Sequence, residues 1–159
     1  MTEQEGLNEG LGRICGTYLN FLMSDTSLEQ KGATSIEFFK KIVLIDNYRE
    51  SAQILFAIHQ ALMFFTGEMA ADTVSQIEGL TGFSISDRII KELTPFEEVL
   101  YILDEGGVAF WLEHGAKVGT EDVLARAHNR SKDTPAEFVR SFEANLKFVE
   151  DYARKADQA

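Results

Sequence analysis

The chain has 159 residues, of which 45% are hydrophobic, and it carries 26 acidic and 15 basic side chains. This length fits one domain, and this apolar fraction excludes general disorder. The single cysteine excludes an internal disulfide and a thiolate-based zinc site, and no apolar stretch is long enough to span a bilayer. The acidic start MTEQEGLNEG lacks the apolar region of a secretory signal, so a cytoplasmic protein is expected.

The first part of the chain predicts two helices. One is expected from about residue 3 to 23, because apolar residues recur there at spacings of three and four. Residues 24–33 are expected to form a loop. Thr34-Ser35-Ile36-Glu37 then matches a capping box, in which a hydroxyl and a carboxylate bind backbone N–H groups at a helix start. A second helix is therefore predicted over about 34–45, although the β-branched run at 42–45 leaves a short strand open.

The third predicted helix is the most apolar segment of the chain. It is expected to start at Asn47 and to end at Gly67, a residue suited to the left-handed conformation that follows many helices. Its apolar residues lie on nearly every face: Ile54, Leu55, Phe56, Ile58, Leu62, Met63, Phe64 and Phe65. A helix that is apolar all round is typical of the centre of a bundle.

Two short helices are expected next, over 70–79 and 86–93, with a turn at Gly82 between them. The apolar spacing across 74–93 resembles a helix-turn-helix, and Leu80-Thr81-Gly82 is similar to a stretch found in many bacterial regulators. The predicted second helix carries as many acids as bases, which is unfavourable for binding DNA phosphates. Two ordinary helices are therefore favoured, and a transcription regulator is kept as an alternative.

Both prolines of the chain are predicted to start helices. Thr94-Pro95-Phe96-Glu97 and Thr134-Pro135-Ala136-Glu137 each combine a hydroxyl cap, a proline at the first helical position and a glutamate two positions later. The second motif opens a last amphipathic helix over 135–156. The whole pattern predicts an all-α fold, a single domain over residues 1–159 with six to eight helices arranged around the central helix at about 47–66.

Motifs for catalysis or metal binding are absent from the sequence. His59, His114 and His128 lie in no metal-ligating pattern. We expect His59 to be buried and the other two to lie near helix ends. Cys15 is on the apolar stripe of the first helix, so it is expected to be a core residue and not a reactive thiol. The chain is therefore expected not to be an enzyme and to hold no metal or cofactor.

The net charge of −11 is concentrated in one block, because residues 94–124 hold seven acids and one base. A concentrated negative charge attracts cationic partners, and a partly exposed aromatic side chain is a common anchor in an interface. Four of the seven acids lie in first turns of predicted helices, where the helix dipole favours them: Glu97, Glu98, Glu121 and Asp122. The other three are not explained by capping: Asp104, Glu105 and Glu113. The candidate partner-binding residues are Glu97, Glu98, Asp104, Glu105, Phe110, Trp111, Glu113, Glu121 and Asp122.

The favoured hypothesis is a non-enzymatic acidic binding protein that occupies a basic surface of a partner protein, as inhibitors, immunity proteins and nucleic-acid mimics do. Its carboxylates would stand in the positions of phosphates on a partner that itself binds nucleic acid. Membrane association and direct nucleic-acid binding are not expected, and a homodimer is compatible with the sequence. A third hypothesis is a sensor for an apolar small molecule, with a pocket formed by some of Phe38, Phe39, Phe64, Phe65, Phe83, Phe96, Phe110 and Trp111.

Overall fold

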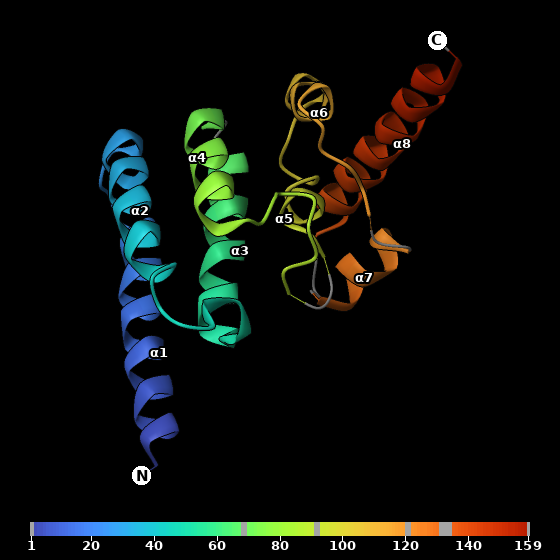
Figure 1. The fold of residues 1–159 in the computed structure, drawn as a ribbon. Coiled ribbons are helices and arrows are strands. Elements are labelled where there is room, and N and C mark those ends of the chain that lie inside the picture. The colour runs from blue at the N-terminus through green and yellow to red at the C-terminus, as the bar shows by residue number, and fades with distance from the viewer. Residues whose placement is uncertain (1, 68–69, 91–92, 120–121, 131–134, 159) are drawn as a thin grey trace. The chain divides into compact units, whose positions relative to one another are not determined.

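In a computed structural model of the chain, the residues described are 2–67, 70–90, 93–119, 122–130 and 135–158. These residues form eight α-helices and one short 3-10 helix and contain no strand, so the predicted all-α fold is confirmed (Figure 1). None of the helices among them is long and apolar enough to cross a membrane. The chain divides into two compact units, Met1–Ile85 and Ser86–Ala159, which are described in turn. The single domain over 1–159 stays a prediction.

Helix α1 (Glu3–Leu22) starts with a capping box and confirms the first predicted helix. The hydroxyl of Thr2 accepts a hydrogen bond from the N–H of Glu5 at 3.1 Å, and the carboxylate of Glu5 accepts one from the N–H of Thr2 at 3.2 Å. Two backbone donors that have no partner within a helix are satisfied in this way.

Helix α2 (Leu28–Ile42) corrects the predictions for residues 24–45. The helix begins after Ser27, whose hydroxyl accepts from the N–H of Gln30. The loop expected over 24–33 is therefore confirmed only for residues 24–27, and the capping box at Thr34 is wrong. Ser35 instead lies inside the helix and accepts a hydrogen bond from the Tyr18 hydroxyl at 2.7 Å. This serine thus contacts α1, and the possible strand at 42–45 is replaced by the end of α2 and the turn that follows it.

Helix α3 (Ala52–Gly67) is the central helix of the first unit and contacts α1, α2 and α4 (Ala71–Thr81). It begins later than predicted, because Asn47 adopts a left-handed φ of 59° and a short 3-10 helix, η1 (Tyr48–Glu50), precedes it. The following α3 residues are completely buried, as expected for a helix that is apolar all round: Ile54, Ala57, Ile58, His59, Ala61, Leu62, Phe65 and Thr66.

Helix α4 ends at Gly82, which has the left-handed φ of 77° that glycine adopts readily. The helix predicted over 86–93 is wrong, because residues 83–90 form turns and bends and residues 91–92 lie outside the described part. The Ser86 hydroxyl accepts from the N–H of Lys117 at 2.8 Å and so is bonded to a loop 31 residues further along the chain. The described part of 74–93 therefore holds one helix and lacks the second helix of a helix-turn-helix.

The second unit consists of α5 (Pro95–Glu98), α6 (Glu105–Glu113), α7 (Val123–Arg130) and α8 (Ala136–Gln158). Thr94 caps α5 as predicted, α8 confirms the last predicted helix, and Thr134 lies outside the described residues. Helix α6 contacts α8. The side-chain amide of Asn145 in α8 donates hydrogen bonds to the carbonyls of Leu100 and Leu103, and the Leu103 bond is 2.8 Å long. This amide fixes α8 to the turns that follow α5.

Candidate functional site

Glu97, the first acidic candidate, is completely buried. One carboxylate oxygen, Oε1, accepts from the N–H of Thr94 at 2.9 Å, and the other, Oε2, accepts from the N–H of Gly119 at 2.9 Å. The carboxylate thus completes the capping box of α5 and also holds a loop 22 residues further along the chain. It stabilises the second unit and does not contribute to the surface.

Asp104 is exposed and caps α6, since its carboxylate accepts from the N–H of Gly107 at 2.7 Å. The expectation from sequence that capping does not account for Asp104 is wrong. Glu105 follows in the first turn of α6, where a negative charge is favoured by the helix dipole. These two acids therefore have a structural role at the helix start and remain open to solvent.

The outward side of α6 carries the exposed part of the acidic block. Glu105, Ala109 and Glu113 are spaced by four residues and so lie along one side of the helix, opposite the buried Trp111. Glu105 and Glu113 are exposed, and within the described part of the chain neither carboxylate is paired with a cation. The negative charge of this side of α6 is therefore not neutralised within the chain.

The aromatic residues of α6 have different environments. Trp111 is only 4% exposed, and its indole N–H has no hydrogen-bond partner among the described residues. Phe110 is partly exposed and packs edge-on against Trp111, with ring centroids 5.1 Å apart. His114 caps the end of α6, as expected of a histidine near a helix end, and its Nδ1 lies 2.7 Å from the carbonyl oxygen of Phe110. Phe110 is therefore available as a surface anchor, whereas Trp111 is not.

The remaining acidic candidates do not all belong to this surface. Glu98 is partly buried, and Glu121 lies outside the described residues. Asp122 is exposed and has a left-handed φ of 54°. It precedes α7, so the expectation that it lies in the first turn of a helix is wrong. The structure thus leaves Asp104, Glu105, Glu113 and the partly exposed Phe110 as one candidate surface at α6.

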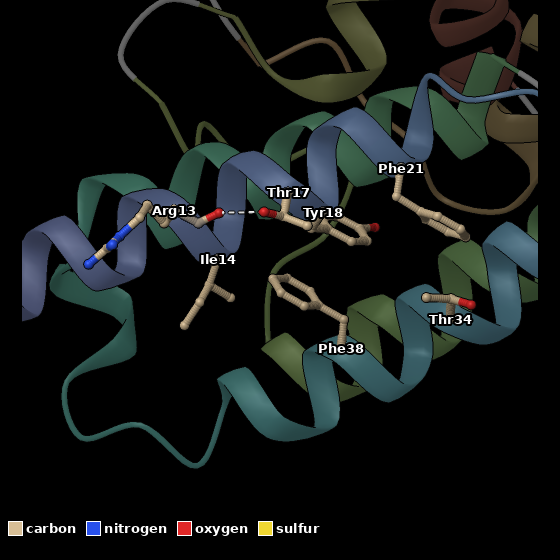
Figure 2. Close-up of a pocket in the computed structure, with 7 residues that line it drawn as sticks. All are labelled: Arg13, Ile14, Thr17, Tyr18, Phe21, Thr34 and Phe38. Carbon is tan, nitrogen blue, oxygen red and sulfur yellow. Dashed lines mark hydrogen bonds between the residues drawn. The ribbon is translucent and has the colours of Figure 1, made fainter.

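A second candidate surface is a groove between α1 and α2 in the first unit, with a volume of about 500 Å³ (Figure 2). The Tyr18 and Phe38 rings are stacked across it, with centroids 4.2 Å apart. Its lining residues are Arg13, Ile14, Thr17, Tyr18, Phe21, Thr34 and Phe38. Of these, only Phe38 belongs to the aromatic set proposed from sequence. Ile14 and Tyr18 belong to the apolar residues that recur along α1 at spacings of three and four, which is the sequence signal for these two.

Three further aromatic candidates, together with His59 and Cys15, belong to the core, whereas Phe64 and Phe83 are only partly buried. Phe39, Phe65 and Phe96 are completely buried. The expected burial of His59 and Cys15 is confirmed, and burial raises the pKa of the Cys15 thiol. Within the described ranges, no group of three or more His, Cys, Asp or Glu side chains is placed to hold a metal ion.

Comparisons with known proteins do not assign this chain to a family. No family model, no curated protein and no solved structure matches it.

Proposed function

We propose that this chain is an acidic binding protein that occupies a basic surface of a partner protein with the outward side of α6. The observation that carries the proposal is the pair of exposed carboxylates at Glu105 and Glu113, which have no cation beside them in the described structure. Asp104 adds a third exposed carboxylate at the N-terminal end of the same helix.

Binding would use charge for approach and Phe110 for contact. Carboxylates on one side of a helix attract a cationic surface over about a Debye length, which is about 8 Å at physiological ionic strength. The Phe110 ring lies against Trp111 and His114, so it is held in place before a partner arrives. An ordered aromatic side chain loses less conformational entropy on binding than a free one does. A nucleic-acid-binding protein is a suitable partner, since its basic surface already recognises a row of negative charges.

The test uses variants of equal net charge. Glu105→Lys/Glu113→Lys reverses the α6 surface, and Glu143→Lys/Glu150→Lys reverses two exposed acids on α8 as a control. Each immobilised protein is exposed to lysate at about 50 mM and about 500 mM salt, and captured proteins are identified by mass spectrometry. We expect the unaltered protein to capture basic proteins at low salt and to release them at high salt.

The α6 variant should lose this capture and the α8 variant should keep it. A purified captured protein should then bind the chain in competition with DNA. The proposal would be contradicted if the amount of captured protein did not change with salt concentration, or if both variants lost capture equally.

A further inference from the structure

One face of the Phe110 ring is covered by its own helix and the other is not. The His114 ring lies against Phe110 with centroids 4.2 Å apart and a tilt of 30°, and Trp111 contacts the ring edge-on. Long side chains of a helix point back toward the residues three and four positions earlier. Both of those positions are glycines here, Gly107 and Gly106. No side chain of α6 therefore covers the face of Phe110 that is turned away from His114.

The space above Gly106 is open apart from one carboxylate. Gly106 is exposed, and a Cβ atom built on it would have one neighbour within 4 Å among the described residues, beyond its own helix backbone and chain neighbours. This neighbour is Oδ1 of Asp104, at 3.5 Å. Oδ1 accepts from the N–H of Gly107, whereas Oδ2 has no hydrogen-bond partner in the described part of the chain. The open position at Gly106 thus lies between a carboxylate and the Phe110 ring one turn later.

Further negative charge flanks this position. Glu105 directly precedes Gly106, and Glu113 follows Phe110 by three residues, which makes their side chains neighbours on the helix surface. Both carboxylates are exposed and unpaired in the described structure, and α6 itself contains no lysine or arginine. The face of an aromatic ring also attracts cations. The position at Gly106 is therefore suited to a cationic side chain of a partner.

A planar cation fits this arrangement better than a compact one. The guanidinium of arginine stacks flat on an aromatic ring and donates several hydrogen bonds in its own plane, whereas the ammonium of lysine is a strongly hydrated point charge. The ring of Phe110 and the carboxylate of Asp104 border the same open position, so one guanidinium would contact both. An ammonium ion would use the carboxylates but would gain little from the flat ring.

We propose that the outward side of α6 recognises an exposed arginine of its partner. The guanidinium lies on the uncovered face of Phe110, above Gly106, and donates to the carboxylate of Asp104. This inference rests on the proposed function and adds to it a preference for arginine over lysine.

The test compares two short peptides of equal length and charge, one containing arginines and the other lysines. Their affinities for the full chain are measured by isothermal titration calorimetry at about 50 mM and about 150 mM salt. We expect the unaltered protein to bind the arginine peptide at least about fivefold more tightly than the lysine peptide. Both affinities should fall as the salt concentration rises.

Two uncharged substitutions test the site, because neither changes the electrostatic attraction. Phe110→Leu removes the ring, and Gly106→Leu fills the open position beside it. Each should lower the affinity for the arginine peptide to that for the lysine peptide, which should itself stay unchanged. The matched controls are Phe138→Leu, at a 40% exposed ring on α8, and Gly79→Leu on α4, where a Cβ would meet nothing within 4 Å. Both controls should keep the preference for arginine.

Circular dichroism checks that each variant keeps its helix content. Gly106→Leu replaces an exposed glycine with a better helix former, so it tests the site even if Phe110→Leu disturbs the fold. Equal affinity of the unaltered protein for the two peptides, lost in Glu105→Lys/Glu113→Lys, would overturn the arginine preference and leave the proposed function standing. A preference that survives in both Phe110→Leu and Gly106→Leu would also overturn it. Binding of neither peptide at low salt would contradict the proposed function as well.

Discussion

The carboxylate of Glu97 and the backbone N–H of Gly119 are joined by a 2.9 Å hydrogen bond across 22 residues of chain. The other oxygen of the same buried carboxylate accepts from the N–H of Thr94, so one side chain holds both a helix start and a remote loop. In Glu97→Gln, the amide NH₂ replaces one acceptor and faces a donor. We expect the free energy of unfolding to fall by about 1.5–3 kcal/mol, the range for hydrogen bonds to charged groups. Urea denaturation measures this loss, and a change below about 0.5 kcal/mol would contradict the assigned role.

Two glycine substitutions should have opposite effects on stability. A Cβ at Gly32 of α2 would lie 2.8 Å from Oγ1 of Thr73 in α4, which is too close for two packed helices. Gly32→Ala is therefore expected to destabilise the protein by about 1–3 kcal/mol. A Cβ added at Gly12 would meet nothing within 4 Å, so Gly12→Ala should stabilise α1 by up to about 1 kcal/mol. Thermal unfolding of both variants checks the signs, and Gly32→Ala/Thr73→Ser shows whether the Thr73 methyl group adds to the crowding.

The first unit should lose stability in alkaline solution. Burial raises the pKa of Tyr18 above its ordinary value, and burial also raises the pKa of Cys15. Each folded group therefore keeps its proton at a pH where the unfolded group has lost it. The free energy of unfolding is unaffected below about pH 8 and falls above about pH 8.5 for the thiol and about pH 10 for the phenol.

The alkaline loss should be smaller in Tyr18→Phe/Cys15→Ala, as measured by urea denaturation at a series of pH values. At neutral pH, Tyr18→Phe removes the hydrogen bond to the buried Ser35 hydroxyl and should cost about 1–2 kcal/mol. Adding Ser35→Ala should recover part of that cost, because the hydroxyl that lost its partner is then absent. If the free energy of unfolding fell equally with rising pH in the double variant and the unaltered protein, the raised pKa values of Tyr18 and Cys15 would not be the cause.

Trp111 is the single tryptophan of the chain, so its fluorescence reports one site. Because the ring is 4% exposed, we expect blue-shifted emission and weak quenching by acrylamide in the folded protein. Trp111→Phe should lose stability because the smaller ring packs less well. It also removes an indole N–H that has no partner among the described residues, and this removal should offset part of the lost stability. Emission typical of a water-exposed indole would contradict the placement of this side chain.

The sequence predicts the helices best where one local signal has no competitor. Thr94 and Pro95 start α5 as expected, since a hydroxyl cap followed by proline favours little else. At α2 the sequence offers both Ser27 and Thr34 as caps; Ser27 is the cap, and Thr34 lies inside the helix. The neighbouring Ser35 accepts a hydrogen bond from Tyr18, a contact 17 residues away in the chain that keeps this stretch packed on α1. Local patterns do not contain that information.

The candidate sites are predicted less well, for the same reason. Composition shows that acids are concentrated between residues 94 and 124, but it does not distinguish a carboxylate in solvent from one inside the fold. Glu97 and Glu105 have the same local signature, a glutamate in a first helical turn, yet Glu97 is completely buried and Glu105 is exposed. The hydrogen bond from Gly119 in a distant loop is one contact that distinguishes Glu97 and that the local pattern does not show.

The uneven cover along α1 has a consequence for its backbone dynamics. Cys15, Tyr18 and Leu22 hold the last two turns of the helix against neighbouring helices, whereas the turns before them have no buried side chain among those described. Opening of the early turns therefore costs little free energy, and their amides should exchange with deuterium much faster than those near Tyr18. Equal protection along the whole of α1 would contradict this difference between its two ends.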